Sequence, residues 1–330
     1  MKLLIFDADA KTRQIFSAAF PEHELVFFEH SPKSDDLTAH PDAEIVSIFT
    51  ASTFKEDSVD ALPHLRCIAT RSTGFDHIAV EYAKHKGITV CNVPRYGTHT
   101  VAEFTFALIL ALSRKVPEAV QQVRDKGSMT TAPFEGINLF GKTLGVIGTG
   151  AIGKSVVRIA QGFGMSILMH DPFPAHEIEN EHTKYVAFDD LIRQSDIITL
   201  HVPYTKENKH IIGKDQFTQM KHGVYLINTA RGELVDTQAL CDALEYGTVA
   251  GAGLDVLEAE RELKDEQRTV TNAPPEVLQT LIRDRELIDN PRVLVTPHIA
   301  FFSREAYEEI LTVSVKNIQN AIAGTPSNTL

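Results

Sequence analysis

The 330-residue sequence contains little cysteine and no excess of positive charge. Its three cysteines, Cys67, Cys91 and Cys241, are far apart and form no CxxC pair, which argues against disulfide bonds and zinc–thiolate sites. The 14 histidines include no HExxH motif, so we expect no metal site. The formal net charge of −12 argues against nucleic acid and anionic membranes as partners, because both bind basic surfaces.

Long apolar segments are absent as well. The apolar run at residues 3–6 is too short for a signal peptide and is typical of a first strand. Residues 101–112 are apolar at ten of twelve positions, but a membrane span needs about 20 residues. We interpret this stretch as a buried helix that connects two domains. We expect a cytoplasmic protein, in a reducing compartment and without a membrane partner.

One stretch of the sequence has the pattern of a nucleotide-binding unit. An apolar run at residues 144–147 leads into a GxGxxG turn, and a helical pattern and a second strand at 167–170 follow. The three glycines of the turn are Gly148, Gly150 and Gly153. The first permits a tight turn, the second lets a pyrophosphate approach the backbone, and the third lets the helix pack closely on the strand. The start of the helix favours phosphates through its free N–H groups.

An acid ends the second strand of this unit. Asp171 lies 18 residues after Gly153, where a carboxylate can accept hydrogen bonds from the adenosine ribose. Its charge would repel the 2′-phosphate of NADP, so the motif predicts NAD as the cofactor. A tight strand–helix–strand turn that binds nothing is the alternative interpretation.

Residues 1–100 alternate strand-like runs with polar or helical segments, which predicts a small parallel sheet without a phosphate loop. Small residues at 71–76 follow the fourth run, and their backbone N–H groups could bind an anion. An ordinary turn is the alternative. Tyr96 follows a later strand and either presents its hydroxyl to a ligand or packs against the protein.

Three side chains of the second half suggest chemistry. Arg231, Glu260 and His298 each follow the carboxyl end of an apolar strand, where ligands gather in doubly wound sheets. A cation, an acid and an imidazole suit a reaction on a carbonyl that carries a carboxylate. The alternative is a surface ion pair of Arg231 with Glu260, and a capping role for His298. We expect the charged residues 261–290 to form a solvated excursion.

Several motifs together make the sequence recognisable. They are RSTGFD at 71–76, NVPRYG at 92–97 with VAEFT after it, GTGAIG at 148–153, HVPYTKENKHII at 201–212, INTARGELVD at 227–236, GLDVLEAE at 253–260 and TPHIAFFSREA at 296–306. With these motifs the sequence resembles the D-isomer-specific 2-hydroxyacid dehydrogenases, and within them the D-lactate dehydrogenase branch.

The resemblance implies an α/β fold of two doubly wound parallel-sheet domains. A flavodoxin-like substrate domain would be discontinuous, formed by residues 1–100 and 299–330. A Rossmann NAD-binding domain would comprise residues 101–298. The resemblance also implies a homodimer.

The resemblance further implies three catalytic roles. Arg231 would bind the substrate carboxylate and polarise the 2-oxo group, and His298 would be the general acid and base. Glu260 would orient the imidazole and favour its protonated form. Glu258 and Glu262 lie near enough in sequence that one of them could be the partner of His298 instead.

Other residues match ligand contacts of the family. The cofactor contacts are Gly148, Gly150, Ala151, Ile152, Gly153, Asp171, Val202, Pro203, Asn208, Thr229, Ala230, Arg231, Asp255 and Thr105. Asp255 would reach the nicotinamide carboxamide, whereas Thr105 could equally be a buried hydroxyl with an internal partner. The substrate contacts are Ser72, Thr73, Gly74, Tyr96, Arg231, His298 and Phe301.

The expected reaction is reduction of a small 2-oxo acid by NADH, with pyruvate to D-lactate as the first candidate. Glyoxylate or hydroxypyruvate reduction and phenylpyruvate reduction are alternatives within the family. Phosphoglycerate is disfavoured, because Arg71 and Arg95 are the only obvious cations for a phosphate. A remote alternative is an NAD-sensing corepressor, in which the same fold serves protein association.

Overall fold

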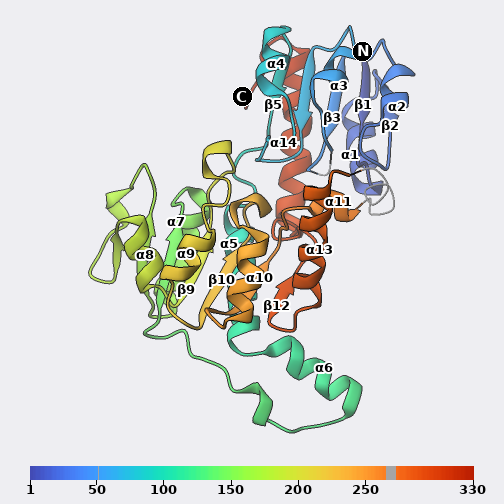
Figure 1. Cartoon of the computed structure of the whole chain (residues 1–330). Helices are drawn as coiled ribbons and strands as arrows, with labels where there is room; N and C mark the ends of the chain where they lie inside the picture. The colour runs from blue at the N-terminus through green and yellow to red at the C-terminus, as the bar shows by residue number, and fades with distance from the viewer. Residues whose placement is uncertain (51, 265–272) are drawn as a thin grey trace. The chain divides into compact units, whose positions relative to one another are not determined.

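The computed structural model describes residues 1–50, 52–264 and 273–330 (Figure 1). The chain divides into two compact units, which we call unit 1 (Met1–Tyr96 and Phe302–Leu330) and unit 2 (Gly97–Phe301). These boundaries lie four and three residues from those expected at 100 and 299.

Unit 1 is built on a parallel sheet of five strands in the order β2-β1-β3-β4-β5 (Figure 1). The strands are β1 (Lys2–Ile5), β2 (Glu24–Phe27), β3 (Ile45–Ile48), β4 (Cys67–Thr70) and β5 (Thr89–Cys91). The helices are α1 (Ala10–Ala19), α2 (Ser34–Thr38), α3 (Glu56–Asp60), α4 (Val80–His85) and α14 (Arg304–Ile322).

Alternate residues of each strand of unit 1 point to opposite faces of the sheet. Leu3 packs with Phe16 of α1 and Leu311 of α14 on one face. Leu4 packs on the other face with residues of α2, α3 and α4, such as Leu37. Helices therefore cover both faces, as expected for a doubly wound sheet.

Unit 2 contains a parallel sheet of seven strands in the order β12-β11-β10-β9-β6-β7-β8. The strands are β6 (Thr143–Ile147), β7 (Ser166–His170), β8 (Thr183–Tyr185), β9 (Ile197–Leu200), β10 (Val224–Asn228), β11 (Val249–Leu254) and β12 (Val293–Val295). The chain starts at β6 in the middle, winds to one edge, and resumes at β9 on the other side of β6. The crevice at this switch point is where such sheets bind ligands, and the glycine turn follows β6.

Helices cover both faces of the second sheet as well. The helices of unit 2 are α5 (Thr98–Ser113), α6 (Val116–Lys126), α7 (Ala151–Gly162), α8 (Phe188–Gln194), α9 (Lys214–Gln219), α10 (Thr237–Glu245), α11 (Glu260–Lys264) and α13 (Pro275–Asp289). Short 3-10 turns are η1 (Ala132–Phe134), η2 (His176–Ile178), η3 (Lys206–Asn208) and η4 (Gly232–Leu234). Residues of α5 and α7 pack on one face, and residues of α8, α9, α10 and α13 pack on the other. The predicted fold class and the helix at 101–112 are confirmed. The expectation that this helix is fully buried is wrong for one face, on which Glu103, Ala107 and Leu110 are exposed.

The expectation of a solvated excursion at 261–290 is wrong for its second part. Residues 275–289 form α13, whose Leu281, Asp284 and Leu287 are buried at a spacing of three. The charged residues of this stretch occupy the outer face, so a high charge content concealed an amphipathic helix. Part of the predicted excursion, residues 265–272, lies outside the described residues.

Helix α6 is exposed to solvent along its whole length. None of its residues is buried, and Val116, Val120 and Val123 are 48%, 40% and 45% exposed. Across the described ranges, no helix is both long enough and apolar enough to cross a membrane.

Candidate active site

The glycine turn after β6 has the geometry of a phosphate-binding loop. Gly148 has a φ of +92°, and a Cβ there would lie 2.6 Å from the carbonyl oxygen of His201 at the end of β9. A Cβ on Gly153 would collide with the carbonyl oxygen of Gly148. Gly150, in contrast, faces open space with no atom within 4 Å of such a Cβ. The first and third glycines are needed for packing, and the second leaves room for a ligand.

The helix that follows this turn begins without a side-chain cap. Ala151 and Ile152 are the first residues of α7, and Gly150 at the N-cap offers no side chain for their N–H groups. Uncapped N–H groups and the positive end of a twelve-residue helix favour an anion. The arrangement therefore fits the pyrophosphate of a dinucleotide.

The acid at the end of β7 is tied to the same turn. Asp171 Oδ2 accepts hydrogen bonds from the Thr149 backbone N–H (2.7 Å) and hydroxyl (3.2 Å). Its Oδ1 accepts the N–H of Phe173 (2.8 Å), and the hydroxyls of Thr149 and Tyr185 are 2.7 Å apart. Asp171 is held as an acceptor beside the glycine turn, as a ribose-binding carboxylate requires.

The loop after β9 carries three predicted cofactor contacts. Val202 is half-buried, and Pro203 is exposed. The side chain of Asn208 donates to the Pro203 carbonyl (2.8 Å) and accepts the N–H of Thr205 (2.8 Å). Asn208 thus supports the loop, and its direct contact with a cofactor stays a prediction.

The loop after β10 is braced by a residue that sequence reasoning missed. Asn228 is 1% exposed, accepts the N–H of Ala230 (3.0 Å) and donates to the carbonyl of Arg231 (2.7 Å). An amide side chain at the end of an apolar strand could have indicated this role, because a buried amide needs hydrogen-bond partners. The half-buried Arg231 side chain also donates through Nη1 to the Ala230 carbonyl (2.8 Å).

Thr105 is fully buried and has internal partners. Its hydroxyl donates to the Val101 carbonyl (2.8 Å) and lies 3.1 Å from the hydroxyl of Thr229. Of the two interpretations offered for Thr105, a buried hydroxyl with an internal partner describes this geometry. Its contact with the cofactor stays a prediction and would act through Thr229.

The strongest feature of unit 2 is the pair formed by His298 and Glu260. His298 Nδ1 lies 3.0 and 3.1 Å from the two carboxylate oxygens of Glu260, and each side chain is 22% exposed. His298 has a φ of +55°, unusual for a residue with a side chain, and its N–H donates to the Thr296 carbonyl (2.9 Å). Glu258, a possible alternative partner, instead accepts from Thr237 (2.9 Å) and contacts His210 Nε2 (2.8 Å).

Asp255 holds the loop that carries His298. Its side chain is 1% exposed, and its Oδ1 accepts the Thr296 hydroxyl (2.6 Å) and the Ile299 N–H (2.9 Å). Its Oδ2 accepts the Ala300 N–H (2.8 Å). Burial raises the pKa of Asp255 above its usual value, against these hydrogen bonds and the nearby His298. The resemblance implies that Asp255 contacts the cofactor, which stays a prediction. In the structure, the hydrogen bonds of Asp255 fix the loop that carries His298.

The loop after β4 in unit 1 begins with a buried cation. Arg71 is 1% exposed and donates to the Ser47 hydroxyl (2.9 Å), the Phe6 carbonyl and the Asp7 carbonyl (3.1 Å). Its guanidinium also lies over the ring of Phe49, 5.6 Å from the centroid. Burial lowers the pKa of Arg71 to about 10, so it is charged at neutral pH.

The following residues leave backbone donors available. The buried Ser72 hydroxyl donates to the Gly74 carbonyl (2.6 Å), which turns this side chain into the protein. Thr73 donates through its hydroxyl to Val93 (2.8 Å) and accepts from Asn92 at its carbonyl (2.8 Å). The backbone N–H groups of Thr73 and Gly74 donate no hydrogen bond within residues 1–50, 52–264 and 273–330.

The two predicted aromatic contacts lie in different units. Tyr96, in unit 1, is half-buried. Phe301, in unit 2, makes an edge-on contact with the His298 imidazole, with ring centroids 6.3 Å apart. Unit 2 therefore brings Glu260, His298 and Phe301 together. The Arg231 loop packs against the segment that leads to Glu260, because a Cβ on the adjacent Gly232 would collide with the Leu257 carbonyl group.

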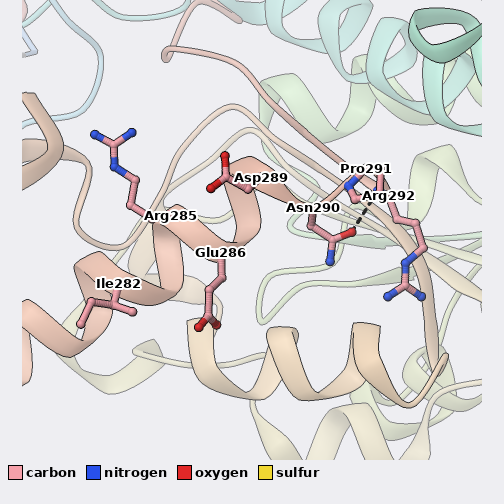
Figure 2. A pocket seen from close by; sticks show the side chains of 7 residues that line it. All are labelled: Ile282, Arg285, Glu286, Asp289, Asn290, Pro291 and Arg292. Carbon is pink, nitrogen blue, oxygen red and sulfur yellow. Dashed lines mark hydrogen bonds between the residues drawn. The ribbon is translucent and has the colours of Figure 1, made fainter. Parts of the chain in front are cut away.

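A surface hollow elsewhere in unit 2 contains none of these residues. Figure 2 shows it at the end of α13, where its volume is about 600 Å³ and the Arg292 N–H donates to Asn290 Oδ1 (3.0 Å). Its lining consists of Ile282, Arg285, Glu286, Asp289, Asn290, Pro291 and Arg292. Among the residues that the structure describes, no group of three or more His, Cys, Asp and Glu side chains could hold a metal ion.

Comparison with known proteins connects this geometry to a family. Residues 106–300 match the family described as D-isomer specific 2-hydroxyacid dehydrogenase, NAD binding domain. A 2-hydroxyacid dehydrogenase homolog from Haemophilus influenzae is 36% identical over 329 residues, covering 98% of this chain and 97% of the relative. An aromatic 2-oxoacid reductase from Clostridium sporogenes is 36% identical over 286 residues, covering 86% of this chain and 84% of the relative.

A solved structure agrees along the whole chain. The D-lactate dehydrogenase from Aquifex aeolicus, in complex with NAD and lactic acid, is 35% identical with a TM-score of 0.89. The similarity covers 98% of this chain and 96% of that protein. The resemblance drawn from the sequence and the predicted NAD-binding domain are confirmed.

Proposed function

Because the chain belongs to the D-isomer specific 2-hydroxyacid dehydrogenase family, and is thus an NAD-dependent oxidoreductase, we propose that it reduces a small 2-oxo acid to the D-2-hydroxy acid. Pyruvate, giving D-lactate, is the first candidate substrate. The observation that carries this proposal is the His298–Glu260 pair in the same unit as the glycine turn.

His298 is the proton donor in the proposed reduction. With Nδ1 directed at the Glu260 carboxylate, Nε2 is the nitrogen available to the substrate. The hydrogen bond with the Glu260 carboxylate fixes the orientation of the ring. His298 then protonates the carbonyl oxygen, while bound NADH supplies the hydride that adds to C2. Proton transfer of this kind typically accelerates a reaction by about 10²–10⁴-fold.

Arg231 and the loop after β4 are proposed to bind the substrate carboxylate. The planar guanidinium of Arg231 can form two parallel hydrogen bonds with a carboxylate, and its charge polarises the neighbouring 2-oxo group. The Thr73 and Gly74 backbone N–H groups, which lack acceptors within the described part of the chain, suit the same anion. Tyr96 and Phe301 are proposed to lie beside the substrate side chain.

Asp171 is proposed to select NAD over NADP. Its two oxygens already accept three backbone or side-chain donors, so the carboxylate is fixed, and a 2′-phosphate beside it would be repelled. NADH is expected to support turnover far better than NADPH. Asp171→Ser should reduce this preference, and a variant with an unchanged preference would contradict the role of Asp171.

The decisive experiment measures NADH oxidation with glyoxylate, pyruvate, 2-oxobutyrate, hydroxypyruvate and phenylpyruvate. A single preferred substrate supports the proposal, and pyruvate supports the D-lactate branch. Preference for phenylpyruvate would place the protein with activities such as that of the Clostridium sporogenes relative. Measurable NADH binding without turnover on any acid would favour the corepressor-like alternative.

Helix α6 supports the expected homodimer. An isolated helix of eleven residues without a buried face is marginal in water, and Val116, Val120 and Val123 form one apolar stripe. We propose that a second copy of the chain covers this stripe. Val120→Glu should shift the protein to monomer in analytical ultracentrifugation, whereas Gln121→Glu, beside the stripe, should not. A dimer that survives Val120→Glu would rule out α6 as its interface.

The cellular location is proposed from the thiols. Cys67, Cys91 and Cys241 are all free, and free thiols suit a reducing compartment. We therefore propose the cytoplasm, which localisation of the tagged protein by fractionation would test.

A further inference from the structure

The buried face of α13 carries a carboxyl group that the proposed reaction does not use. Asp284 is fully buried between Leu281 and Leu287, which belong to the packed face of the same helix. A carboxyl group in such a position is unfavourable unless hydrogen bonds compensate for its lost hydration. Within residues 1–50, 52–264 and 273–330, its Oδ1 has no hydrogen-bond partner. The position therefore calls for an explanation.

The other oxygen of Asp284 holds the backbone next to Glu260. Asp284 Oδ2 accepts the N–H of Ala259 at 2.8 Å, and Ala259 is only 3% exposed. Ala259 directly precedes Glu260, the first residue of α11. Water cannot replace this acceptor at a buried N–H, so the bond fixes the point where the helix with Glu260 begins.

The same segment is confined from its other end. A Cβ on Gly232 would collide with the Leu257 carbonyl group and would lie 2.5 Å from the Glu258 nitrogen. Residues 257–260 thus run between the Arg231 loop and Asp284. A shift of this segment would move the Glu260 carboxylate away from His298 Nδ1.

The charges around Asp284 favour its neutral form. Burial, followed by the nearby Glu258 and Glu262 carboxylates, raises the pKa of Asp284 to about 7, although the Ala259 N–H and Thr237 oppose this shift. Glu258 itself accepts from Thr237. Near neutral pH, a large fraction of Asp284 side chains is therefore protonated. A protonated Asp284 still accepts the Ala259 N–H and places no additional negative charge next to Glu260.

We propose that Asp284 is a positioning residue, which fixes Glu260 opposite His298 through its hydrogen bond with the Ala259 backbone. The inference rests on the proposed function of the His298–Glu260 pair. It assigns no contact with substrate to Asp284, which acts only through the backbone of residues 257–260.

Three variants separate this role from a general effect on folding. Asp284→Ala removes the acceptor of the Ala259 N–H and should lower kcat about tenfold, because a buried hydrogen bond usually contributes an energy of that size. The KM for NADH should stay unchanged. Asp284→Asn keeps an acceptor of the same shape and should restore kcat to within about threefold of the wild type. Asp289→Asn, an exposed acid on the same helix, should leave kcat unchanged. An Asn variant as slow as the Ala variant, or an Ala variant at wild-type kcat, would overturn the proposal.

A second measurement needs neither turnover nor a stable Ala variant. The NMR signal of the Ala259 amide should change as the wild-type protein is titrated through neutral pH, and this change should vanish in Asp284→Asn. The His298 ring signal, identified with His298→Asn, should keep its wild-type position in Asp284→Asn and move in Glu260→Gln, which replaces the carboxylate that faces Nδ1. An Ala259 amide signal that is the same in the wild type and in Asp284→Asn at every pH would refute the role of Asp284.

If the wild-type protein reduced none of the five 2-oxo acids, the proposed substrate class would be wrong. The NMR experiment would still decide whether Asp284 holds the segment that carries Glu260.

Discussion

The loop after β4 in unit 1 and the loop after β12 in unit 2 are held by buried charges of opposite sign. In unit 1, Arg71 donates to the carbonyls of Phe6 and Asp7 and to a serine hydroxyl. In unit 2, Asp255 accepts the N–H groups of Ile299 and Ala300 and a threonine hydroxyl. Each buried ion has three polar partners, which compensates for its lost hydration.

The sign of the buried charge decides what each loop leaves available. The cation in unit 1 occupies carbonyl oxygens, and the N–H groups of Thr73 and Gly74 are left over among the described residues. The anion in unit 2 occupies N–H groups of its loop, and an imidazole with a paired carboxylate is presented instead. The available groups therefore support the proposal that the loop of unit 1 binds an anion and that unit 2 transfers a proton.

The largest effect is expected from the proton donor of unit 2. His298→Asn should lower kcat by about two to four orders of magnitude, the usual contribution of general acid–base catalysis. The KM for NADH should change little, because the glycine turn is untouched. Steady-state kinetics with the preferred acid checks this, with the exposed His222→Asn as control. A His298→Asn enzyme at wild-type turnover would remove the proton-transfer role from unit 2.

The next effect concerns stability and pH at Asp284. Its pKa rises from 3.8 to about 7 on folding. The contribution of the neutral, buried carboxyl group to the free energy of unfolding is therefore complete below pH 3.8 and is lost as the pH rises through 7. At 1.36 kcal/mol per pH unit, wild-type protein should lose about 4 kcal/mol relative to Asp284→Asn over this range.

Urea unfolding of both proteins between pH 4 and 8 measures this difference. Glu258, Glu262 and Cys241, the titratable groups that interact with Asp284, are the same in both proteins. Asp289→Asn is the matched control and should follow the wild-type curve. Parallel curves for Asp284→Asn and wild type would show that Asp284 is ionised throughout.

A smaller effect is expected from the cation of unit 1. Arg71→Lys keeps a charge, but a single ammonium group cannot reach the three acceptors of the guanidinium. The free energy of unfolding should fall by about 1.5–3 kcal/mol, as for other hydrogen bonds to charged groups. The KM for the 2-oxo acid should rise several-fold with little change in kcat, because the loop binds the carboxylate without transferring a proton.

Arg66→Lys, on an exposed arginine next to the same strand, provides the control for that experiment. If Arg71→Lys lost as much kcat as His298→Asn, the assignment of anion binding to unit 1 and proton transfer to unit 2 would be contradicted. An unchanged KM would remove the anion-binding role from the loop after β4.

The smallest effect is expected at Thr105. Thr105→Val preserves the shape of the side chain but removes the partner of the Thr229 hydroxyl, which should cost about 1 kcal/mol of stability. Thr105→Ser should restore it. If the KM for NADH rises strongly in Thr105→Val while stability is unchanged, Thr105 contacts the cofactor directly.

Local patterns predicted much of this molecule. Apolar runs and polar spacers gave two parallel sheets, and the glycine spacing with Asp171 gave the nucleotide turn, because these features depend on neighbouring residues and on backbone sterics. The proposed catalytic residues could be predicted from sequence because each follows the carboxyl end of a strand. Helix α13 was missed because its inward face was hidden among charged residues.

The sequence by itself determined which chemical groups gather at the carboxyl ends of the strands. Only the tertiary structure decided which acid faces His298, since Glu258, Glu260 and Glu262 are equivalent by spacing and the chosen contact spans 38 residues. It also decided that Asp255 and Asp284 would be buried acceptors, over separations of 45 and 25 residues. Burial and hydrogen-bond partners set the charge state of an acid, and both depend on packing between distant segments that no local pattern encodes.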